Sequence, residues 1–447
     1  MPIQMNSLLI ISFAGAHFRS IAEFAFVGVN LVVLVFFAVC VLYLVILLLA
    51  AVPLRGRVTS LAPGEKTGIA TAAIGQAGSP RLALLLPAHN EEMVLDAALK
   101  SLGGIDYPAD RFRIVVIADN CTDRTAEIAA ANGAVVLTRF NDLEIGKGYA
   151  LEWALKELFA AGARGDFKLV EIADFDGIVV LDADTLVSPN LLTAFAAGLA
   201  RGEKAMQVRY EVLNSGDSWR TKLMSCALAL VHIVKPLGRE HLELSDGLKG
   251  NGMCFARNVV ESVPWSGASI TEDIEYTLRL CRAGYRVAFL PDAAVWAQMP
   301  VTGAQAASQR QRWEGGRYQL LFGVAPRLVM EALRKRSLVL LDRGMELIIP
   351  PFAEMFAIPL VFLALCGTAL GLTGWPWAAG LAWAWIAILG LQAGYLFGGL
   401  WVARVPRSVA ISVLAAPIYI VWKFGLYAVM AVGRSAGGWK RTERRKI

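Results

Sequence analysis

Long uncharged apolar runs lie near both ends of the chain. Phe24–Leu54 contains no charged residue, and Asn30 is its only strongly polar side chain. Met355–Ala403 is also uncharged and is interrupted by a Gly- and Pro-containing turn at residues 371–376. An α-helix needs about 20 apolar residues to cross a bilayer. The pattern therefore predicts one membrane helix in the first part of the chain and two consecutive ones after residue 355.

The flanking charges predict an orientation for these helices. Arg55 and Arg57 follow the first apolar run, and basic residues mark the cytoplasmic end of a membrane helix. A signal peptide would be shorter, with a basic start and a small-residue cleavage site. We therefore expect a multi-pass protein of the cell (inner) membrane whose middle part lies in the cytoplasm.

The middle part, residues 81–314, alternates short apolar runs with amphipathic stretches. The runs expected to form buried strands are Leu82–Leu86, Arg113–Ile117, Val135–Thr138 and Gly177–Leu181. The stretches expected to form helices are Glu91–Leu102, Thr122–Ala131, Tyr149–Ala161 and Asn190–Leu199. This alternation predicts an α/β domain with a mostly parallel sheet and helices on both faces. In such sheets, ligands bind beyond the carboxyl ends of the strands.

The remaining segments are assigned by composition. Residues 1–55 form the first membrane segment, and residues 56–80, rich in Gly, Ala, Thr and Ser, form a linker. Residues 315–346 mix Leu, Val and Met with Arg, which predicts amphipathic helices on the cytoplasmic membrane surface. Residues 347–433 hold the C-terminal transmembrane or re-entrant helices, and residues 434–447 form a basic tail.

The last apolar stretch, Val409–Gly433, is ambiguous. It contains Pro417 and, near its centre, Lys423. A spanning helix would place the basic tail outside, against the positive-inside rule, and a Lys at mid-bilayer costs about 2.5–3.5 kcal/mol on insertion scales. We favour an interfacial or re-entrant arrangement that keeps the tail inside, with a spanning helix as the alternative.

Composition agrees with a protein that lies partly in lipid. Hydrophobic residues make up 56% and charged residues 18%, against about 45–50% and 25% in soluble chains. The net charge of +6 is explained by basic flanks of the apolar runs, and no stretch interleaves basic with aromatic residues as a nucleic-acid surface would. The six cysteines form no CxxC pair, which indicates reduced, structural thiols.

Two polar turns follow the first two predicted strands. Pro87-Ala88-His89-Asn90-Glu91 joins a strand to a helix, with Asn90 in a position to cap that helix. Asp119 follows the second strand closely enough to face a ligand. Taken singly, each turn is as well explained by helix capping.

A pair of carboxylates follows the fourth predicted strand. Asp182 and Asp184 are two residues apart, so both side chains point to one side. Like charges this close repel unless a cation lies between them, and oxygen ligands suit Mg²⁺ or Mn²⁺ shared with substrate phosphates. Asp174 and Asp176 precede the strand and are expected to be solvated.

Two later segments carry candidate catalytic groups. Thr271-Glu272-Asp273 precedes a helical pattern and reads either as a capped helix start or as a general base held there. Gln309-Arg310-Gln311-Arg312-Trp313 offers a guanidinium fork beside an aromatic ring, or is an ordinary basic amphipathic helix.

In this order, these features resemble the family-2 inverting membrane glycosyltransferases, the group that contains cellulose, hyaluronan and poly-N-acetylglucosamine synthases. Asp119, Asp182-Ala183-Asp184, Thr271-Glu272-Asp273 and Gln309-x-x-Arg312-Trp313 match the D, DxD, TED and QxxRW motifs of the family. Further similar segments are Pro87–Glu91, Gly146-Lys147-Gly148, Gly250-Asn251-Gly252-Met253 and Trp439–Thr442. The resemblance implies a GT-A-like fold flanked by membrane and interfacial helices.

The resemblance also implies roles for individual residues. The donor site for a UDP-sugar would consist of Pro87, Asn90, Glu91, Asp119, Lys147, Asp182 and Arg312. Within it, Asp119 and the Pro87–Glu91 turn would hold the uracil and ribose, Asp182 would hold the diphosphate, and Arg312 would stabilise the departing diphosphate. Asp182 and Asp184 would hold Mg²⁺ or Mn²⁺, Asp273 would be the general base, and Glu272 would orient it. The acceptor would contact Gly252, Met253, Gln309 and Trp313.

The sequence departs from the family in places and leaves the product open. Ala118-Asp119-Asn120 stands where many synthases have two aspartates, and no cyclic-dinucleotide domain follows the last apolar stretch. The first hypothesis is a polysaccharide synthase that extends a β-linked glycan and exports it through its own helices. The second is transfer of one sugar to a lipid, as in ceramide glucosyltransferase, and the third is a catalytically inactive scaffold. The expected partners are a UDP-sugar, a glycan or lipid acceptor and membrane lipids, but no nucleic acid; an oligomer or an accessory export subunit is left open.

Overall fold

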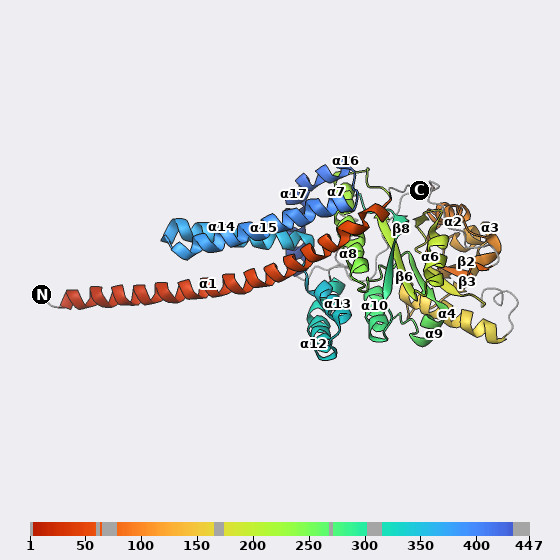
Figure 1. Cartoon of the computed structure of the whole chain (residues 1–447), viewed down its shortest axis with the longest axis horizontal. Coiled ribbons are helices and arrows are strands. Elements are labelled where there is room, and N and C mark those ends of the chain that lie inside the picture. Colours follow the sequence, from red (N-terminus) through yellow and green to blue (C-terminus); the bar gives the residue numbers. More distant parts are fainter. Residues whose placement is uncertain are drawn as a thin grey trace. The chain divides into compact units, whose positions relative to one another are not determined.

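The computed structural model describes residues 3–59, 63–64, 78–164, 174–267, 271–301 and 315–431. The chain divides into two compact units: one combines Met1–Ile46 with Pro350–Phe397, and the other combines Leu47–Ile349 with Gly398–Ile447. Figure 1 shows the ribbon of both.

The first unit consists of apolar helices. It holds most of α1 (Ile3–Ala51), all of α14 (Phe352–Thr373) and most of α15 (Pro376–Val402). Trp385 and Phe37 are buried at their contact. Asn30 is also buried, and its Oδ1 accepts hydrogen bonds from Trp385 Nε1 at 3.1 Å and Cys366 Sγ at 3.4 Å. Such hydrogen bonds between helices stabilise packing where apolar surface alone gives no driving force.

The second unit is built on an eight-stranded mixed sheet, in the order β3-β2-β1-β4-β7-β6-β8-β5. The strands are β1 (Leu82–Ala88), β2 (Phe112–Asp119), β3 (Val135–Arg139), β4 (Gly177–Val180), β5 (Leu186–Val187), β6 (Ala205–Val212), β7 (Met253–Ala256) and β8 (Val287–Ala297). β1, β2, β3 and β4 pair in parallel, as do β6 and β8, whereas β7 runs antiparallel to both β4 and β6.

Helices cover both faces of this sheet. Those of the αβ part are α2 (Leu95–Gly103), α3 (Thr125–Ala131), α4 (Lys147–Arg164), α6 (Leu191–Ala200), α9 (Arg257–Ser262) and α10 (Glu272–Arg282). Buried residues of α4, α9 and α10 pack on one face, and those of α2 and α6 pack on the other. Alternating side chains of the strands feed these two hydrophobic cores, as expected for a sheet buried on both sides.

The remaining described elements surround this sheet. They are η1 (Val52–Arg57), η3 (Ala109–Arg111), α7 (Trp219–Ala229), η4 (Leu230–Val234), α8 (Lys235–His241), α12 (Ala325–Lys335), α13 (Leu338–Ile348), α16 (Arg407–Ala410), η5 (Ile411–Ala415) and α17 (Ala416–Ala431). α7 and η4 lie against β6, and the His232 ring stacks on Tyr210 with a centroid separation of 5.4 Å. α12 and α13 pack together around Leu328 and Leu340.

The predicted α/β architecture is confirmed. All four predicted strands and the four helices between them form, with boundaries shifted by a few residues. The predicted turn at residues 371–376 separates α14 from α15. All six cysteines are free.

Within the ranges that the structure describes, five helices are long and apolar enough to cross a membrane. They are Ile21–Arg57, Trp219–His241, Phe352–Thr373, Pro376–Val402 and Arg407–Gly425. Trp219–His241 was not predicted as a membrane helix, because Lys222, Lys235 and Arg239 interrupt its apolar pattern. In Arg407–Gly425, Lys423 is 2% exposed, with its ammonium 5.3 Å from the Tyr427 ring centre. Burial against protein reduces the cost of this charge, and whether the helix spans or lies at the interface stays a prediction.

The glycine before β7 is required by both backbone and packing. Gly252 has φ +68°, and a Cβ there would lie 2.7 Å from Val208 Cγ2 and 2.8 Å from Val295 Cγ2. This φ lies in the left-handed region that favours glycine. The two distances are too short for a real Cβ, so Val208 of β6 and Val295 of β8 would have to shift.

We expect Gly252→Ala to lower the thermal unfolding midpoint, because overpacking costs about 1–3 kcal/mol and left-handed strain about 1–2 kcal/mol. The matched control is Gly202→Ala, where φ is +90° but no atom lies within 4 Å. Differential scanning fluorimetry in detergent should show a larger loss for Gly252→Ala. Equal losses would show that packing around Gly252 contributes nothing.

Candidate functional site at the carboxyl edge of the sheet

The turns after β1 and β2 are fastened to each other. His89 Nδ1 lies 2.8 Å from the Asp119 carbonyl oxygen, and Asn90 Oδ1 accepts a hydrogen bond from the Thr122 N–H at 2.7 Å. The Glu91 N–H donates to Thr125 Oγ1 at 2.8 Å. Asn90 has φ +55°, a conformation that Asn tolerates better than most residues. The predicted donor residues Pro87, Asn90, Glu91 and Asp119 are therefore brought together at one edge.

Asp119 forms a buried ion pair that the sequence did not predict. Arg139 Nη1 donates to Asp119 Oδ1 at 2.7 Å, and the two side chains are 4% and 6% exposed, respectively. Arg139 also donates to the Glu144 carbonyl oxygen at 2.9 Å and to Glu144 Oε2 at 3.1 Å. Arg139 ends β3, directly beside Asp119 in the strand register. A single Arg after a short strand carries no motif, so only pairing of β2 with β3 reveals this contact.

Lys147 joins the DxD segment to the loop before β7. Its ammonium donates to Asp182 Oδ1 and to the Gly250 carbonyl oxygen. Asp182 N–H in turn donates to Asn251 Oδ1 at 3.1 Å. Burial lowers the pKa of Lys147, but the carboxylates of Asp182, Glu272 and Asp273 outweigh it and the net shift is upward. The residue stays a cation in a site shared by three carboxylates.

Asn251 is a further buried polar residue of this loop. It is 0% exposed, and its Nδ2 donates to Thr185 Oγ1 at 2.8 Å. Its carbonyl oxygen accepts from Gln207 Nε2 at 2.8 Å, while Gln207 Oε1 accepts from the Lys249 N–H. Buried amides that satisfy each other in this way fix a loop in one conformation.

The structure brings Glu272 and Asp273 to the same cluster. Both are at the start of α10, and Asp273 Oδ1 accepts from the Ile274 N–H at 2.8 Å. Asp273 Oδ2 lies 3.5 Å, and Lys147 Nζ 3.7 Å, from the position that a Cβ on Gly250 would occupy. The base predicted from sequence therefore lies beside Gly250 and the Lys147 ammonium. A pocket opens next to it, lined by Ser266, Glu272, Glu275, Tyr276 and Arg279.

Burial raises the pKa values of both carboxyl groups of this segment. It raises the pKa of Glu272 to about 7, and the negative charge of Asp273 adds to the rise. Burial also raises the pKa of Asp273, against the lowering effects of the Ile274 N–H and the Lys147 and Lys249 charges. Glu272, with its pKa near 7, can hold and release a proton near neutral pH.

The DxD carboxylates have different environments. Asp184 is 3% exposed, and the Asp182 side chain keeps 31% of its surface exposed. Within the described ranges, no group of three or more acidic, His or Cys side chains forms a cation cage. A two-carboxylate oxygen set of this kind fits Mg²⁺ or Mn²⁺ that takes its remaining ligands from water and phosphate.

The remaining predicted residues either lie in the hydrophobic core or fall outside the residues that the structure describes. Met253 packs its side chain into the hydrophobic core, which leaves its backbone for any acceptor contact. Gln309, Arg312 and Trp313 lie outside the described residues, and their roles stay predictions.

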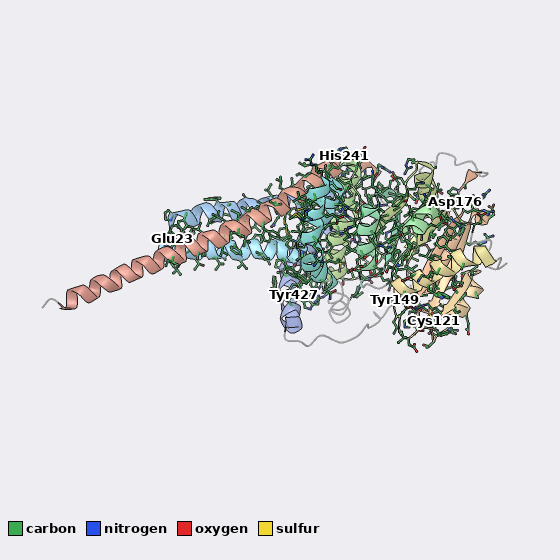
Figure 2. The ribbon with its side chains drawn as sticks, turned by 90° about the horizontal axis from the view of Figure 1, so that it is seen from below. Glu23, Cys121, Tyr149, Asp176, His241 and Tyr427 are labelled. Carbon is green, nitrogen blue, oxygen red and sulfur yellow. The ribbon has the colours of Figure 1, made fainter. Side chains whose placement is uncertain are left out.

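The opposite edge of the sheet holds no part of this cluster. Asp176 accepts from the Arg81 N–H at 2.7 Å, and Asp174 pairs with the Arg81 guanidinium; both acids are exposed. In Figure 2, Asp176 lies apart from Cys121 and Tyr149, which are on the side of the carboxyl edge.

We expect Glu272→Gln to stabilise the protein more at pH 8 than at pH 5. The folded state holds the Glu272 proton up to about pH 7, whereas the unfolded carboxyl group loses it near its ordinary value of about 4.3. Deprotonation therefore costs stability as pH rises through this window, and Gln removes that cost.

The measurement is the thermal midpoint of variant and wild type at both pH values. Glu275→Gln, an exposed residue of the same helix, controls for the loss of one negative charge. An equal gain from Glu272→Gln at pH 5 and pH 8 would contradict the assignment.

Comparison with known proteins identifies the family. The family model "Glycosyltransferase like family 2" matches residues 80–316, more than half of the chain. The chain is 29% identical over 252 residues to the probable glycosyltransferase YdaM of Bacillus subtilis, covering 54% of this chain and 56% of that protein. It is 27% identical over 273 residues to the beta-monoglucosyldiacylglycerol synthase of Synechocystis sp., covering 59% and 53%.

More distant similarities extend the set. Glucomannan 4-beta-mannosyltransferase 7 of Arabidopsis thaliana is 21% identical over 258 residues, covering 57% of this chain and 46% of that protein. The structure of a mannosyltransferase from Pyrobaculum calidifontis in complex with GDP-Man and Mn²⁺ aligns with a TM-score of 0.47 at 17% identity, covering 83% of this chain and 99% of that one. The chain spans about half the length of the curated relatives it matches. The family match, which covers the sheet and its carboxyl-edge cluster, shows that the chain belongs to glycosyltransferase family 2.

Proposed function

We propose that this protein is a membrane-integrated inverting glycosyltransferase that moves a hexosyl group from a UDP-sugar to a hydroxyl group of a lipid. The observation that carries the proposal is the convergence of Lys147, Asp182 and Asp273 around Gly250 at the carboxyl edge of the sheet. One cation, a carboxylate pair for a metal-bound diphosphate and a half-buried base are the groups that displacement at an anomeric carbon requires.

Asp273 acts as the general base in this proposal. The acceptor hydroxyl oxygen attacks the anomeric carbon and gives its proton to Asp273 Oδ2, while the bond from that carbon to the UDP oxygen breaks. One displacement inverts the anomeric centre, so an α-linked donor yields a β-glycoside. A raised pKa makes Asp273 a better proton acceptor, and a positioned base contributes about 10²–10⁴-fold.

Lys147 and the DxD carboxylates serve the donor. Asp182 and Asp184 would hold Mg²⁺ or Mn²⁺, which neutralises charge on the diphosphate when bound. The Lys147 ammonium lies on the same side of the cluster and can stabilise the departing UDP. The predicted roles of Arg312 at the diphosphate, and of Gln309 and Trp313 at the acceptor, complete the proposal.

The packing of the apolar helices favours a lipid acceptor. In the described part of the first unit, Trp385, Phe37 and the hydrogen-bonded Asn30 fill the space between α1, α14 and α15. A glycan needs a hydrated path across the membrane, and a path between these three helices would have to displace these buried side chains. The name of the Synechocystis relative, a beta-monoglucosyldiacylglycerol synthase, supports transfer to a diacylglycerol-type lipid.

Synthesis of a β-linked polysaccharide is the second candidate. It is supported by the glucomannan 4-beta-mannosyltransferases among the relatives, and export would then require several copies of the chain or a partner subunit. Both candidates place the catalytic domain in the cytoplasm of a multi-pass protein of the inner membrane, with Arg55 and Arg57 at the cytoplasmic side.

The test is product analysis with purified protein. Radiolabelled UDP-glucose, UDP-N-acetylglucosamine, UDP-galactose and UDP-glucuronate are each supplied with diacylglycerol in mixed micelles and Mn²⁺. We expect one donor to give a monoglycosylated lipid that extraction into organic solvent recovers. A water-soluble polymer would favour the second candidate. If no donor gave either a glycosylated lipid or a polymer, the proposal would be overturned.

Asp273→Asn is the catalytic control in the same assay. It keeps the size of the side chain but removes the base, so turnover should fall by about 10²-fold or more while UDP still binds. Asp176→Asn, at the opposite edge, should transfer like the wild type. Unchanged turnover in Asp273→Asn would exclude it as the base.

We expect Asp184→Ala to abolish the dependence of UDP binding on Mn²⁺. Wild-type protein should bind UDP more tightly with Mn²⁺ than with EDTA, because an ion held by Asp182 and Asp184 would neutralise charge on the diphosphate. Isothermal titration with and without the ion measures the difference, with Asp174→Ala as the control at the exposed Asp174. An undiminished Mn²⁺ effect in Asp184→Ala would contradict the metal assignment.

A further inference from the structure

The loop between β3 and α4 connects the two halves of the donor site. It begins after Arg139, which pairs with Asp119, and ends at Lys147, which pairs with Asp182. Residues 140–146 therefore run from the predicted base-binding carboxylate to the predicted diphosphate-binding one. Contacts that hold residues 140–146 in one conformation therefore also help to position Arg139 and Lys147, the partners of these two carboxylates.

Hydrogen bonds hold the loop in one conformation. Asn141 Oδ1 accepts from the N–H groups of Leu143 and Glu144 at 2.9 and 3.1 Å. Asn120 and Asn141 exchange two further hydrogen bonds, in which the Asn141 N–H donates to Asn120 Oδ1 at 2.8 Å and Asn120 Nδ2 donates to the Asn141 carbonyl oxygen at 3.1 Å. The loop is thus fastened directly to the turn after β2 that carries Asp119.

This ordered loop exposes three apolar side chains. Phe140 is 73%, Leu143 96% and Ile145 53% exposed. Single apolar residues are common on surfaces, but these three lie within six residues of an ordered loop beside the predicted donor site, where a bound ligand could cover them. Their place between Asp119 and Lys147 indicates the nucleoside of the donor as that ligand.

Arg139 is the residue that links the loop to Asp119. Its guanidinium donates to Asp119 Oδ1 on one side and to Glu144 on the other. Among the described residues, none donates a hydrogen bond to Asp119 Oδ2. A carboxylate with one oxygen held by an arginine presents its other oxygen in a fixed direction, as an acceptor only.

We propose that Arg139 is a positioning residue for the donor nucleobase: it aims Asp119 at the imide N–H of the base and holds residues 140–146 against the nucleoside. This inference rests on the proposed UDP-sugar transfer. Uracil carries an N–H between its two carbonyl groups, whereas cytosine has a ring nitrogen without hydrogen there. An acceptor-only oxygen therefore selects uracil over cytosine.

The test separates the base side of the site from its diphosphate side. Arg139→Met should lower the binding affinity for both UMP and UDP by roughly 10- to 100-fold, as expected when a charged hydrogen bond of a buried pair is lost. The same variant should also show a smaller preference for UMP over CMP. Lys147→Met should weaken UDP more than UMP, because it removes a cation at the diphosphate. Arg139→Lys should recover part of the affinity. The readout is isothermal titration of each nucleotide with the full-length protein in detergent.

Steady-state kinetics gives a second readout. Arg139→Met should raise KM for the UDP-sugar at least several-fold while kcat at saturating donor stays within about threefold, since the arginine touches no reacting atom. General misfolding would instead lower kcat through loss of active enzyme.

The exposed side chains allow a test that does not disturb the buried pair. The double variant Phe140→Ser/Leu143→Ser should keep the thermal unfolding midpoint of the wild type and should bind UMP several-fold more weakly. Leu333→Ser, an exposed apolar position of α12, is the matched control and should leave UMP binding unchanged.

Two outcomes would overturn the inference: an unchanged UMP affinity in both Arg139→Met and the Phe140/Leu143 double variant, or an Arg139→Met loss confined to UDP. If the wild type binds no uridine nucleotide and transfers from no UDP-sugar, the proposed function itself fails. The wild-type titration thus distinguishes the two failures.

Discussion

The Lys147 ammonium is the contact on which the site depends. It connects the first residue of α4 to Asp182 after β4 and to the Gly250 carbonyl before β7. Without this cation, the half-buried carboxylates of Asp182, Glu272 and Asp273 would repel one another. The upward shift of the Lys147 pKa, despite burial, shows that attraction to these carboxylates exceeds the cost of desolvation. Three segments far apart in sequence are thereby held in one place by a single charge.

A second set of buried charges fixes the loop before β7 from its other side. Lys249 Nζ donates to Asp246 Oδ2 at 2.8 Å, and Arg239 of α8 donates to Asp342 of α13 at 3.1 and 3.2 Å. Arg239 Nη1 also lies 3.7 Å from Asp246 Oδ1. Removing one partner from such a network leaves a buried charge uncompensated, which is strongly destabilising. The loop that carries Gly250 is therefore anchored to helices on one side and to Lys147 on the other.

Local patterns predicted most of the fold, whereas contacts between distant segments were beyond them. The Val- and Leu-rich runs of β1 and β4 and the amphipathic helices between strands are visible in the sequence because burial imposes their period. Asp182, Asp184 and Asp273 stood out because their order along the chain matches the motifs of the family. Arg139 was not singled out, and Asn251 was noted only within the segment Gly250–Met253, because their contacts arise from the pairing of β3 with β2 and of β7 with β4. The helix at Trp219–His241 was missed because its charges point into the protein, where partners such as Asp342 and Glu346 neutralise them.

In the proposed function, the order of these segments would separate the two substrates. The predicted donor residues Asn90, Asp119 and Lys147 all come from the parallel half of the sheet, where hydrogen bonds connect each turn to the next. Asp273 and Gly250 come from the second half, around the antiparallel strand β7. Among the described residues, Lys147, Asp182, the Asn251–Thr185 hydrogen bond and the pairing of β4 with β7 connect the two halves. If the proposed roles hold, the acceptor side could change while the predicted donor residues keep their mutual contacts in the parallel half.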